Sequence, residues 1–394
     1  MFESLPESKP DAILALMQKF RADERADKID LGVGIYKDAA GKTPVMKAIK
    51  AAEQNVIQTQ DTKAYVGPLG NAEFCQAMVD QVFGPEADLD RVRCGQTLGG
   101  SGALRELADL MMIAHPEAQI WVSDPTWPNH IPLLSAAGFS LQRYAYYDSE
   151  TSSVDLDGML SDLGKAKSGD LVLLHGCCHN PTGADLNVEQ WQAVADVLIQ
   201  RNLIPFVDIA YQGFGDGLEE DAFAVRLLAK QVPEMVVAAS CSKNLALYRE
   251  RAGAAMLLAR DKAEADLALA NLSTVIRANY SMPADHGATV VTEVMTNSGL
   301  NRQWREELES MRVRMVKQRK DFAQALRERS NSDRFDYIAD QKGMFSRLPL
   351  TPDQIESLRA NKGIYIVGDG RINVAGLPEG GLDALADAIV DAMR

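Results

Sequence analysis

Three apolar segments of the chain are each followed by side chains that can do chemistry. The segments are LVLL (171–174), IPFV (204–207) and MVVAA (235–239). The groups that follow them are an amide, a carboxylate, a phenol, two hydroxyls and an amine, which belong to Asn180, Asp208, Tyr211, Ser240, Ser242 and Lys243. Ligands of open α/β sheets bind beyond the carboxyl ends of the strands. We therefore expect these side chains to share one site.

The chemistry that unites these groups is that of pyridoxal phosphate. The Lys243 amine can form a Schiff base with the cofactor, and the Asp208 carboxylate can keep the pyridine nitrogen protonated, so that the ring accepts electrons. Asn180 and Tyr211 can bond the ring's 3-oxygen. The glycine-rich loop 99–102 opens a helical segment and offers N–H groups to a phosphate. Each feature alone is common in turns and caps, but their order at successive strand ends favours this site.

Apolar and helical segments alternate along the chain, which is typical of an α/β protein with a mostly parallel sheet. The expected strands are 119–123, 171–174, 204–207 and 235–239, and the expected helices are 102–114 and 188–201. The last part of the chain differs. It has a long charged helical stretch (301–330), short strand-like pieces (343–348 and 364–374) and a final helix, which together predict a smaller α+β domain.

Composition narrows the class of protein. The 394 residues carry a formal net charge of -14, which argues against a nucleic-acid surface. The N-terminus lacks the pattern of a secretory signal, and no apolar run approaches the length of a membrane span. Five cysteines are an odd and sparse set, so we expect a reducing cytoplasm rather than a disulfide scaffold.

Several motifs in order resemble the class I aspartate and aromatic amino-acid aminotransferases, from Phe2 nearly to the C-terminus. They are FRADERADKIDLGVGIYKD (20–38), DPTWPNH (124–130), CCHNPTG (177–183), DIAYQGF (208–214), SCSKN with YRER (240–251) and GRINVAG (370–376). The resemblance implies the fold-type I architecture of pyridoxal-phosphate enzymes, with a large cofactor domain (44–310) and a small domain from both chain ends (1–43 and 311–394). It also implies a homodimer with shared active sites.

The resemblance assigns the cofactor residues one by one. Lys243 matches the Schiff-base lysine, which also moves the substrate's α-proton. Asp208 matches the partner of the pyridine nitrogen, with His130 behind it, while Asn180 and Tyr211 match the 3-oxygen ligands. The remaining matches are the ring-stacking aromatic Trp127, the phosphate ligands Gly100, Ser101, Ser240, Ser242 and Arg251, and Tyr65, which reaches the phosphate of the partner subunit.

The resemblance also assigns the substrate residues. Arg371 matches the arginine that grips the α-carboxylate as a bidentate fork, and Arg277 matches the arginine that crosses the dimer to a side-chain carboxylate. Gly34 matches the small residue over the substrate, and the ring of Trp127 and the amide of Asn180 also border it.

Some positions depart from the aspartate-preferring pattern. Ala64, Ser101 and Met282 stand where such members tend to have Asn, Thr and Asn, and Leu245-Ala246 stands where Phe-Gly is more frequent. Less polar surroundings would let Arg277 swing away and admit an aromatic side chain. We therefore expect use of both aromatic and dicarboxylic amino acids, with a strictly aspartate-specific aminotransferase as the alternative.

Other functions fit less well. His175, Cys177, Cys178 and His179 are soft metal ligands, but they lack zinc spacing, and adjacent residues of an extended chain point to opposite faces. We expect the cysteines to be packed, His175 to be hydrogen-bonded, and no metal. The loop from Gly100 lacks the third glycine of a dinucleotide motif. The acidic charge and the match from Phe2 onward disfavour a DNA-binding regulator on this fold, and two arginines for two carboxylates disfavour a decarboxylase or β-lyase.

Overall fold

A computed structural model describes residues 2–5, 7 and 12–394 of the chain. The residues group into two units by their internal contacts. One unit comprises Met1–Thr43 and Met315–Arg394, and the other comprises Pro44–Arg314. The division falls inside helix α11 (Ser298–Ser330).

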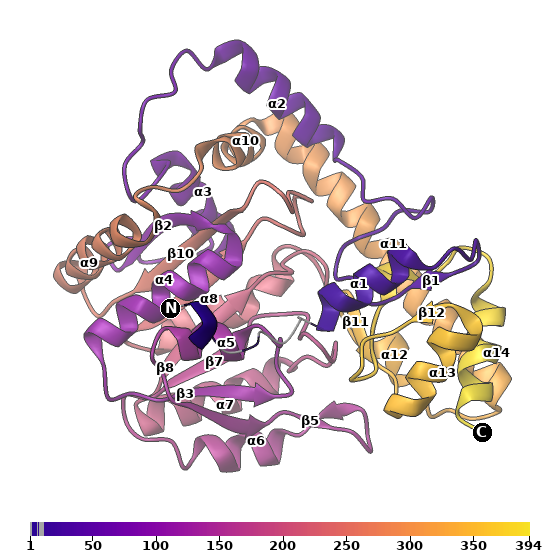
Figure 1. The fold of residues 1–394 in the computed structure, drawn as a ribbon. Helices are drawn as coiled ribbons and strands as arrows, with labels where there is room; N and C mark the ends of the chain where they lie inside the picture. Colours follow the sequence, from indigo (N-terminus) through magenta and orange to yellow (C-terminus); the bar gives the residue numbers. More distant parts are fainter. Residues whose placement is uncertain (1, 6, 8–11) are drawn as a thin grey trace. The chain divides into compact units, whose positions relative to one another are not determined.

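The larger unit is built on a seven-stranded sheet with the order β2-β10-β9-β8-β7-β3-β4 (Figure 1). Strand β10 runs antiparallel to both of its neighbours, whereas the pairs from β9 to β4 are parallel. The strands are β2 (Val92–Leu98), β3 (Ile120–Asp124), β4 (Leu141–Ala145), β7 (Leu171–His175), β8 (Ile204–Ile209), β9 (Met235–Ser240) and β10 (Ala252–Leu258).

The strands of this sheet are apolar at successive positions, so both faces of the sheet are buried. Leu171 and Leu173 of β7 belong to the core cluster that also holds Leu107 of α4, whereas the intervening Val172 and Leu174 are buried on the opposite face. The helices of this unit are α2 (Lys47–Thr59), α3 (Ala72–Phe83), α4 (Gly99–Ala114), α5 (His130–Ala136), α6 (Leu156–Leu163), α7 (Val188–Arg201), the 3-10 turn η2 (Glu220–Ala222), α8 (Phe223–Gln231), α9 (Lys262–Tyr280) and α10 (Asp285–Thr296). A small hairpin joins β5 (Tyr147–Asp148) to β6 (Ser153–Val154).

The smaller unit has its own apolar core, which includes Leu31, Phe322, Leu358, Ile372 and Ile389. Two pairs of short strands lie in it, β1 parallel to β12 and β11 antiparallel to β13. Its elements are η1 (Phe2–Ser4), α1 (Ala12–Ala22), β1 (Ile29–Asp30), α12 (Tyr337–Asp340), β11 (Phe345–Arg347), α13 (Pro352–Lys362), β12 (Ile364–Tyr365), β13 (Arg371–Asn373), η3 (Val374–Gly376) and α14 (Leu382–Ala392).

The observed architecture confirms the predicted fold class of a mostly parallel mixed sheet flanked by helices. The helix expected at 188–201 has those bounds, because Asn187 caps it and Gln190 completes a capping box. The pieces expected at 343–348 and 364–374 form short strands within those ranges. Three strands of the main sheet, β2, β4 and β10, and the short strands β1, β5 and β6 were not anticipated.

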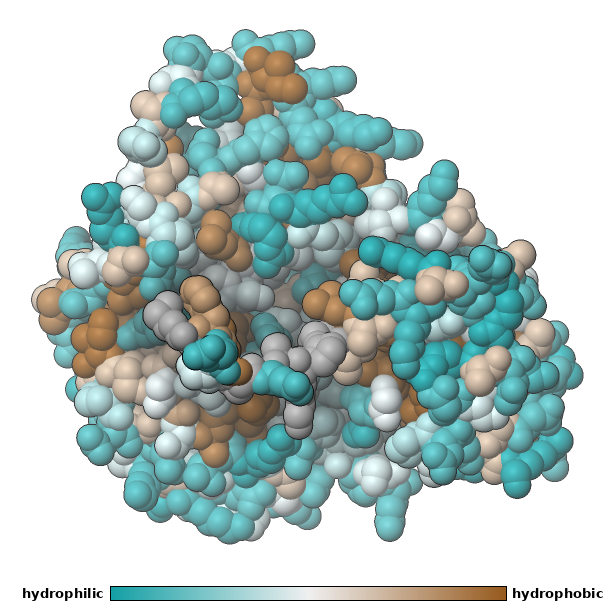
Figure 2. Space-filling view, in the orientation of Figure 1, coloured by the Kyte–Doolittle hydropathy of each residue, from teal (hydrophilic) through white to brown (hydrophobic). Residues whose placement is uncertain are grey.

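The surface drawn in Figure 2 is mostly hydrophilic. Hydrophobic side chains form small separate patches on this face. Among the residues that the structure describes, no helix combines the length and the apolar character needed to span a bilayer.

Candidate active site

The carboxyl ends of β7, β8 and β9 bring the predicted chemistry together in the larger unit. His175, Asp208 and Ala238 are paired across these three strands, so Asp208 lies in the middle of the edge. Its Oδ2 lies 3.0 Å from Nε2 of His130, and Nδ1 of that histidine lies 2.8 Å from the Thr126 hydroxyl. All three side chains of this chain of bonds are buried.

The environment keeps Asp208 ionised. Burial alone would raise the pKa of its carboxyl, but the hydrogen bond to His130 and the nearby histidine and lysine charges outweigh burial, so the pKa is lowered. A buried carboxylate in this state can hold a proton on a nitrogen base that contacts it.

Lys243 follows β9 at the same edge and is half-buried. Burial lowers the pKa of its amine to about 8, although the charge of Asp208 opposes this shift. Its Nζ lies 4.8 Å from the ring centre of Tyr211. The Asn180 amide nitrogen is 3.4 Å from the Tyr211 hydroxyl. A partly neutral amine, a phenol and an amide therefore stand close together.

Glycines and hydroxyls form a cradle at the start of α4. Gly99 has a φ of +70°, and a Cβ on it would lie 2.6 Å from Nη2 of Arg251. A Cβ on Gly100 would lie 3.0 Å from the Cβ of Ser240. Arg251 also donates to the Ser242 hydroxyl at 3.3 Å. A helix N-terminus, two hydroxyls and a guanidinium in this arrangement can bind an anion.

Two further predicted residues border these groups. Ser101 lies in the first turn of α4, and Trp127 is half-buried at the β3–α5 connection. The Trp127 ring meets the ring of His130 edge-on, with 5.1 Å between centroids.

In the smaller unit, Arg371 and Gly34 are gathered around Phe345. The Arg371 guanidinium is buried, lies 4.5 Å from the Phe345 ring centre and donates to the Gly32 carbonyl at 2.9 Å. A Cβ on Gly34 would lie 3.0 Å from the same ring. The Asn373 amide fixes this loop by donating to the carbonyls of residues 33 and 35.

Tyr65 and Arg277 lie on the surface of the larger unit. Tyr65 is 92% exposed and follows α2 in a loop. Arg277 is exposed near the end of α9, where its Nη1 donates to the Ser281 hydroxyl at 2.9 Å. Side chains that bind a ligand are seldom this exposed within one subunit.

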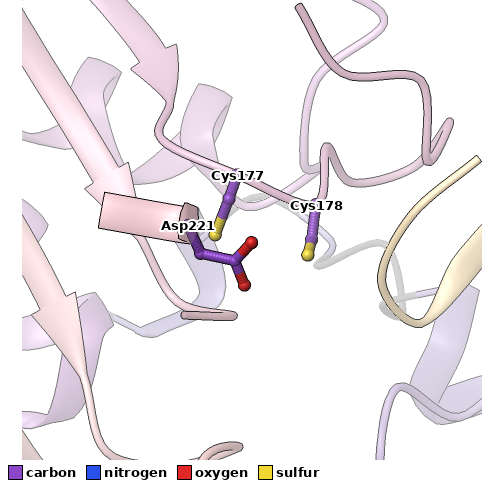
Figure 3. Close-up of side chains that lie close together, drawn as sticks. All are labelled: Cys177, Cys178 and Asp221. Carbon is purple, nitrogen blue, oxygen red and sulfur yellow. The ribbon is translucent and has the colours of Figure 1, made fainter. Parts of the chain in front are cut away.

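The expectation that Cys177 and Cys178 point apart was wrong. Cys178 has a φ of 53°, so the chain is not extended there, and both sulfurs lie on the same side as the Asp221 carboxylate (Figure 3). Burial raises the pKa of the Cys178 thiol, and the Asp221 carboxylate accepts three backbone N–H groups from residues 213–216. Metal binding needs deprotonated thiols and a carboxylate with free oxygen lone pairs. Here the thiols stay protonated and the Asp221 carboxylate is engaged by the backbone, so it anchors the loop 213–216.

The expected hydrogen bond of His175 was also wrong. Its two buried ring nitrogens have no hydrogen-bond partner among the described residues, and burial lowers its pKa to about 3. Its ring packs between His130 and His179, at 5.2 and 4.2 Å.

Two residues that organise the site were missed from the sequence. Thr126 anchors the histidine behind Asp208, and Asn373 holds the loop of Gly34. Thr126 lies four residues before His130, the first residue of α5, in an irregular segment, so helical spacing gave no signal for it. For Asn373 the signal is an amide among apolar residues, since a buried amide needs partners.

Comparisons with known proteins all identify aminotransferases. A family model described as aminotransferase class I and II matches residues 26–389. An aromatic-amino-acid aminotransferase of Paracoccus denitrificans is 48% identical over 391 residues, and an aspartate aminotransferase of Escherichia coli (strain K12) is 44% identical over 393, each covering 99% of both chains. The solved structure of an aromatic-amino-acid aminotransferase from Burkholderia pseudomallei, covalently bound to pyridoxal phosphate, has a TM-score of 0.97 at 40% identity and covers 100% of both chains.

Proposed function

Because the chain belongs to the class I and II aminotransferases, we propose that it exchanges amino groups between aromatic or dicarboxylic amino acids and 2-oxoglutarate. The aromatic substrates are tyrosine, phenylalanine and tryptophan, and the dicarboxylic ones are aspartate and glutamate. The observation that carries the proposal is the edge of the sheet where an ionised Asp208 stands near the low-pKa amine of Lys243.

The cofactor of this reaction is pyridoxal 5'-phosphate, and the residues present fit it. The cradle at Gly99 and Gly100 admits an anion where a Cβ would block it, and Arg251 supplies a positive charge. When bound, the cofactor supplies an electron sink for the substrate's α-carbon. Asp208 would hold a proton on the ring nitrogen, and Trp127 would stack on the ring.

Lys243 acts as nucleophile and proton carrier. With a pKa of about 8, a substantial share of its amines is neutral near that pH. Lys243 would hold the cofactor through its aldehyde carbon with loss of water, and once the substrate's amine had displaced it, the freed amine would carry the α-proton. Tyr211 and Asn180, which are in contact with each other, would hydrogen-bond the 3-oxygen of the cofactor ring.

The two arginines divide substrate recognition. Arg371 binds the α-carboxylate, with Phe345 beneath its guanidinium and Gly34 leaving space beside it. Arg277 binds a side-chain carboxylate. Its described partner is the neutral hydroxyl of Ser281, which would let it leave when the substrate is aromatic. Relatives include both aromatic-amino-acid and aspartate aminotransferases, which supports the broad range, and strict aspartate specificity is the alternative.

The active unit is a homodimer with shared sites. Ile57 within α2 and Tyr65 in the loop after it, at 77% and 92% exposure, support a partner over this region. The exposed Arg277 then serves the partner's site. The five free cysteines support a reducing, cytoplasmic setting.

The test is a panel of kcat/KM values with 2-oxoglutarate as acceptor, for wild type and Arg277→Ala. Breaking a charge-assisted pair costs about 2–5 kcal/mol, so aspartate and glutamate use should fall on the order of 10² to 10³ or more. The phenylalanine half-reaction, followed by cofactor absorbance, should change far less. Arg260→Ala is the control, because that exposed arginine pairs with Glu234. Efficient wild-type turnover of aspartate with negligible turnover of phenylalanine and tyrosine would leave the aspartate-specific alternative.

A further inference from the structure

Helices α4 and α9 are joined by a buried carboxylate. Glu106 is 2% exposed, and the Asn279 amide nitrogen lies 3.1 Å from each of its two oxygens. The same nitrogen lies 3.1 Å from Oδ2 of Asp109, which also accepts from Arg105 at 2.9 Å. The amide of one helix is thus held by two carboxylates of the other.

This cluster is set into an apolar contact between the two helices. Ala103 and Leu107 of α4 and Leu272 and Ile276 of α9 belong to the same core cluster. Burial raises the pKa of Glu106, and the charge of Asp109 raises it further, although the Asn279 bond opposes both effects. An apolar side chain at 106 would avoid this desolvation cost. The Glu106 carboxylate therefore fixes how α4 and α9 are oriented at their contact, and it lowers the stability of the folded protein.

The cluster of Glu106, Asp109 and Asn279 links two helices that each have one end near a proposed binding group. Helix α4 begins at the anion cradle, and α9 ends at Tyr280, three residues after Arg277. Asn279 lies in that last turn, so its bond to Glu106 fixes the rotation of the turn about the helix axis. Ser281, which accepts from Arg277, follows immediately with a φ of 72°.

We propose that Glu106 is a positioning residue that sets substrate specificity. It holds Asn279, and through it the last turn of α9, so that Arg277 points to the side-chain carboxylate of a dicarboxylic substrate. This inference rests on the proposed function of Arg277. Aromatic substrates, which do not use Arg277 as an ion-pair partner, should be indifferent to Glu106.

The test compares Glu106→Leu and Glu106→Gln holoenzymes with wild type. Leucine removes both acceptors, so kcat/KM for aspartate should fall about tenfold, mainly through KM, while the value for phenylalanine should stay within about twofold. Glutamine keeps one acceptor and should give an intermediate loss, and it is the variant to use if Glu106→Leu does not fold. Asp266→Asn is the matched control, because it removes the Arg93 ion pair (2.7 Å) at the other end of α9. It should leave the ratio of the two substrates unchanged.

A double variant separates positioning from general structure. In an Arg277→Ala background, Glu106→Gln should cause no further loss toward aspartate, because both changes act through one guanidinium. Additive losses, or equal losses toward aspartate and phenylalanine, would overturn the inference. An Arg277→Ala enzyme with unchanged aspartate use would overturn the proposed role of Arg277 itself. That result needs no Glu106 variant, so the two failures are distinguishable.

Discussion

The Lys243 amine differs from an exposed lysine because desolvation disfavours its charged form. Its pKa is about 8, and only the neutral amine is nucleophilic. In the cofactor-free protein, acylation of Lys243 should therefore reach half of its own maximal rate near pH 8, as measured residue by residue with mass spectrometry. An ordinary lysine amine, with a pKa of about 10.4, reaches half of its maximal rate at higher pH.

Asp208→Asn provides the internal control for that measurement. The carboxylate raises the pKa of Lys243, so its removal should move the acylation midpoint to lower pH. A wild-type midpoint near the ordinary lysine pKa of about 10.4 would mean that Lys243 is not desolvated.

Asp208→Asn should also lower kcat on the order of 10² or more, because an amide cannot hold a proton on the ring nitrogen and the electron sink weakens. Folding should be retained, since asparagine still accepts a hydrogen bond from His130. Steady-state kcat and a thermal melt check the two halves of this expectation. Near wild-type kcat would show that the carboxylate has another role.

At the scale of elements, strand β10 shapes the cradle from behind. A Cβ on Gly253 would lie 2.7 Å from the Cα of Gly99, and backbone cannot give way as a flexible side chain can. Gly253→Ala should displace the β2–α4 turn and weaken pyridoxal phosphate binding by about tenfold or more. A fluorescence titration of the cofactor-free protein measures this Kd.

Gly299→Ala is the control for Gly253→Ala, because its Cβ would meet only the Asn297 side chain, at 3.4 Å. Its cofactor affinity should equal that of wild type. Unchanged affinity in Gly253→Ala would show that the turn adjusts without cost to the cradle.

Ligands of open α/β sheets bind beyond the carboxyl ends of the strands, so the part of the site that follows identifiable strands could be predicted from the sequence. Segments 171–174 and 235–239 are short and bounded by polar residues, so their ends, and with them Lys243, could be located. Strand β10, AGAAMLL (252–258), could not, because a continuous apolar run fits a buried helix or strand equally and only its pairing decides.

Other details depend on backbone angles or on distant partners. The positive φ of Cys178 turns its sulfur to an unexpected side, and the contact between Glu106 and Asn279 spans 173 residues. Neither the φ of Cys178 nor the contact of Glu106 with Asn279 follows from local periodicity, because tertiary packing decides both.

For the whole molecule, shared sites predict complementation between two inactive variants. Lys243→Ala lacks the amine, and Arg277→Ala lacks the arginine that we propose serves the partner's site. A hybrid dimer then has one intact site, so an equal mixture should regain about one quarter of wild-type aspartate sites after subunit exchange. Aspartate turnover of the mixture, compared with each variant alone, checks this. Absence of recovery after mass spectrometry has shown hybrid dimers would contradict shared sites.

The register that pairs His175 with Asp208 and Ala238 also determines where the gene can gain or lose codons without loss of activity. Side chains alternate between the faces of a strand, so one codon inserted within 204–207 would turn Asp208 to the opposite face and away from His130. An insertion in the exposed hairpin between Asp148 and Ser153 would leave that register untouched. Descendants of this gene should therefore vary in length at such hairpins while the codon count of β8 stays constant.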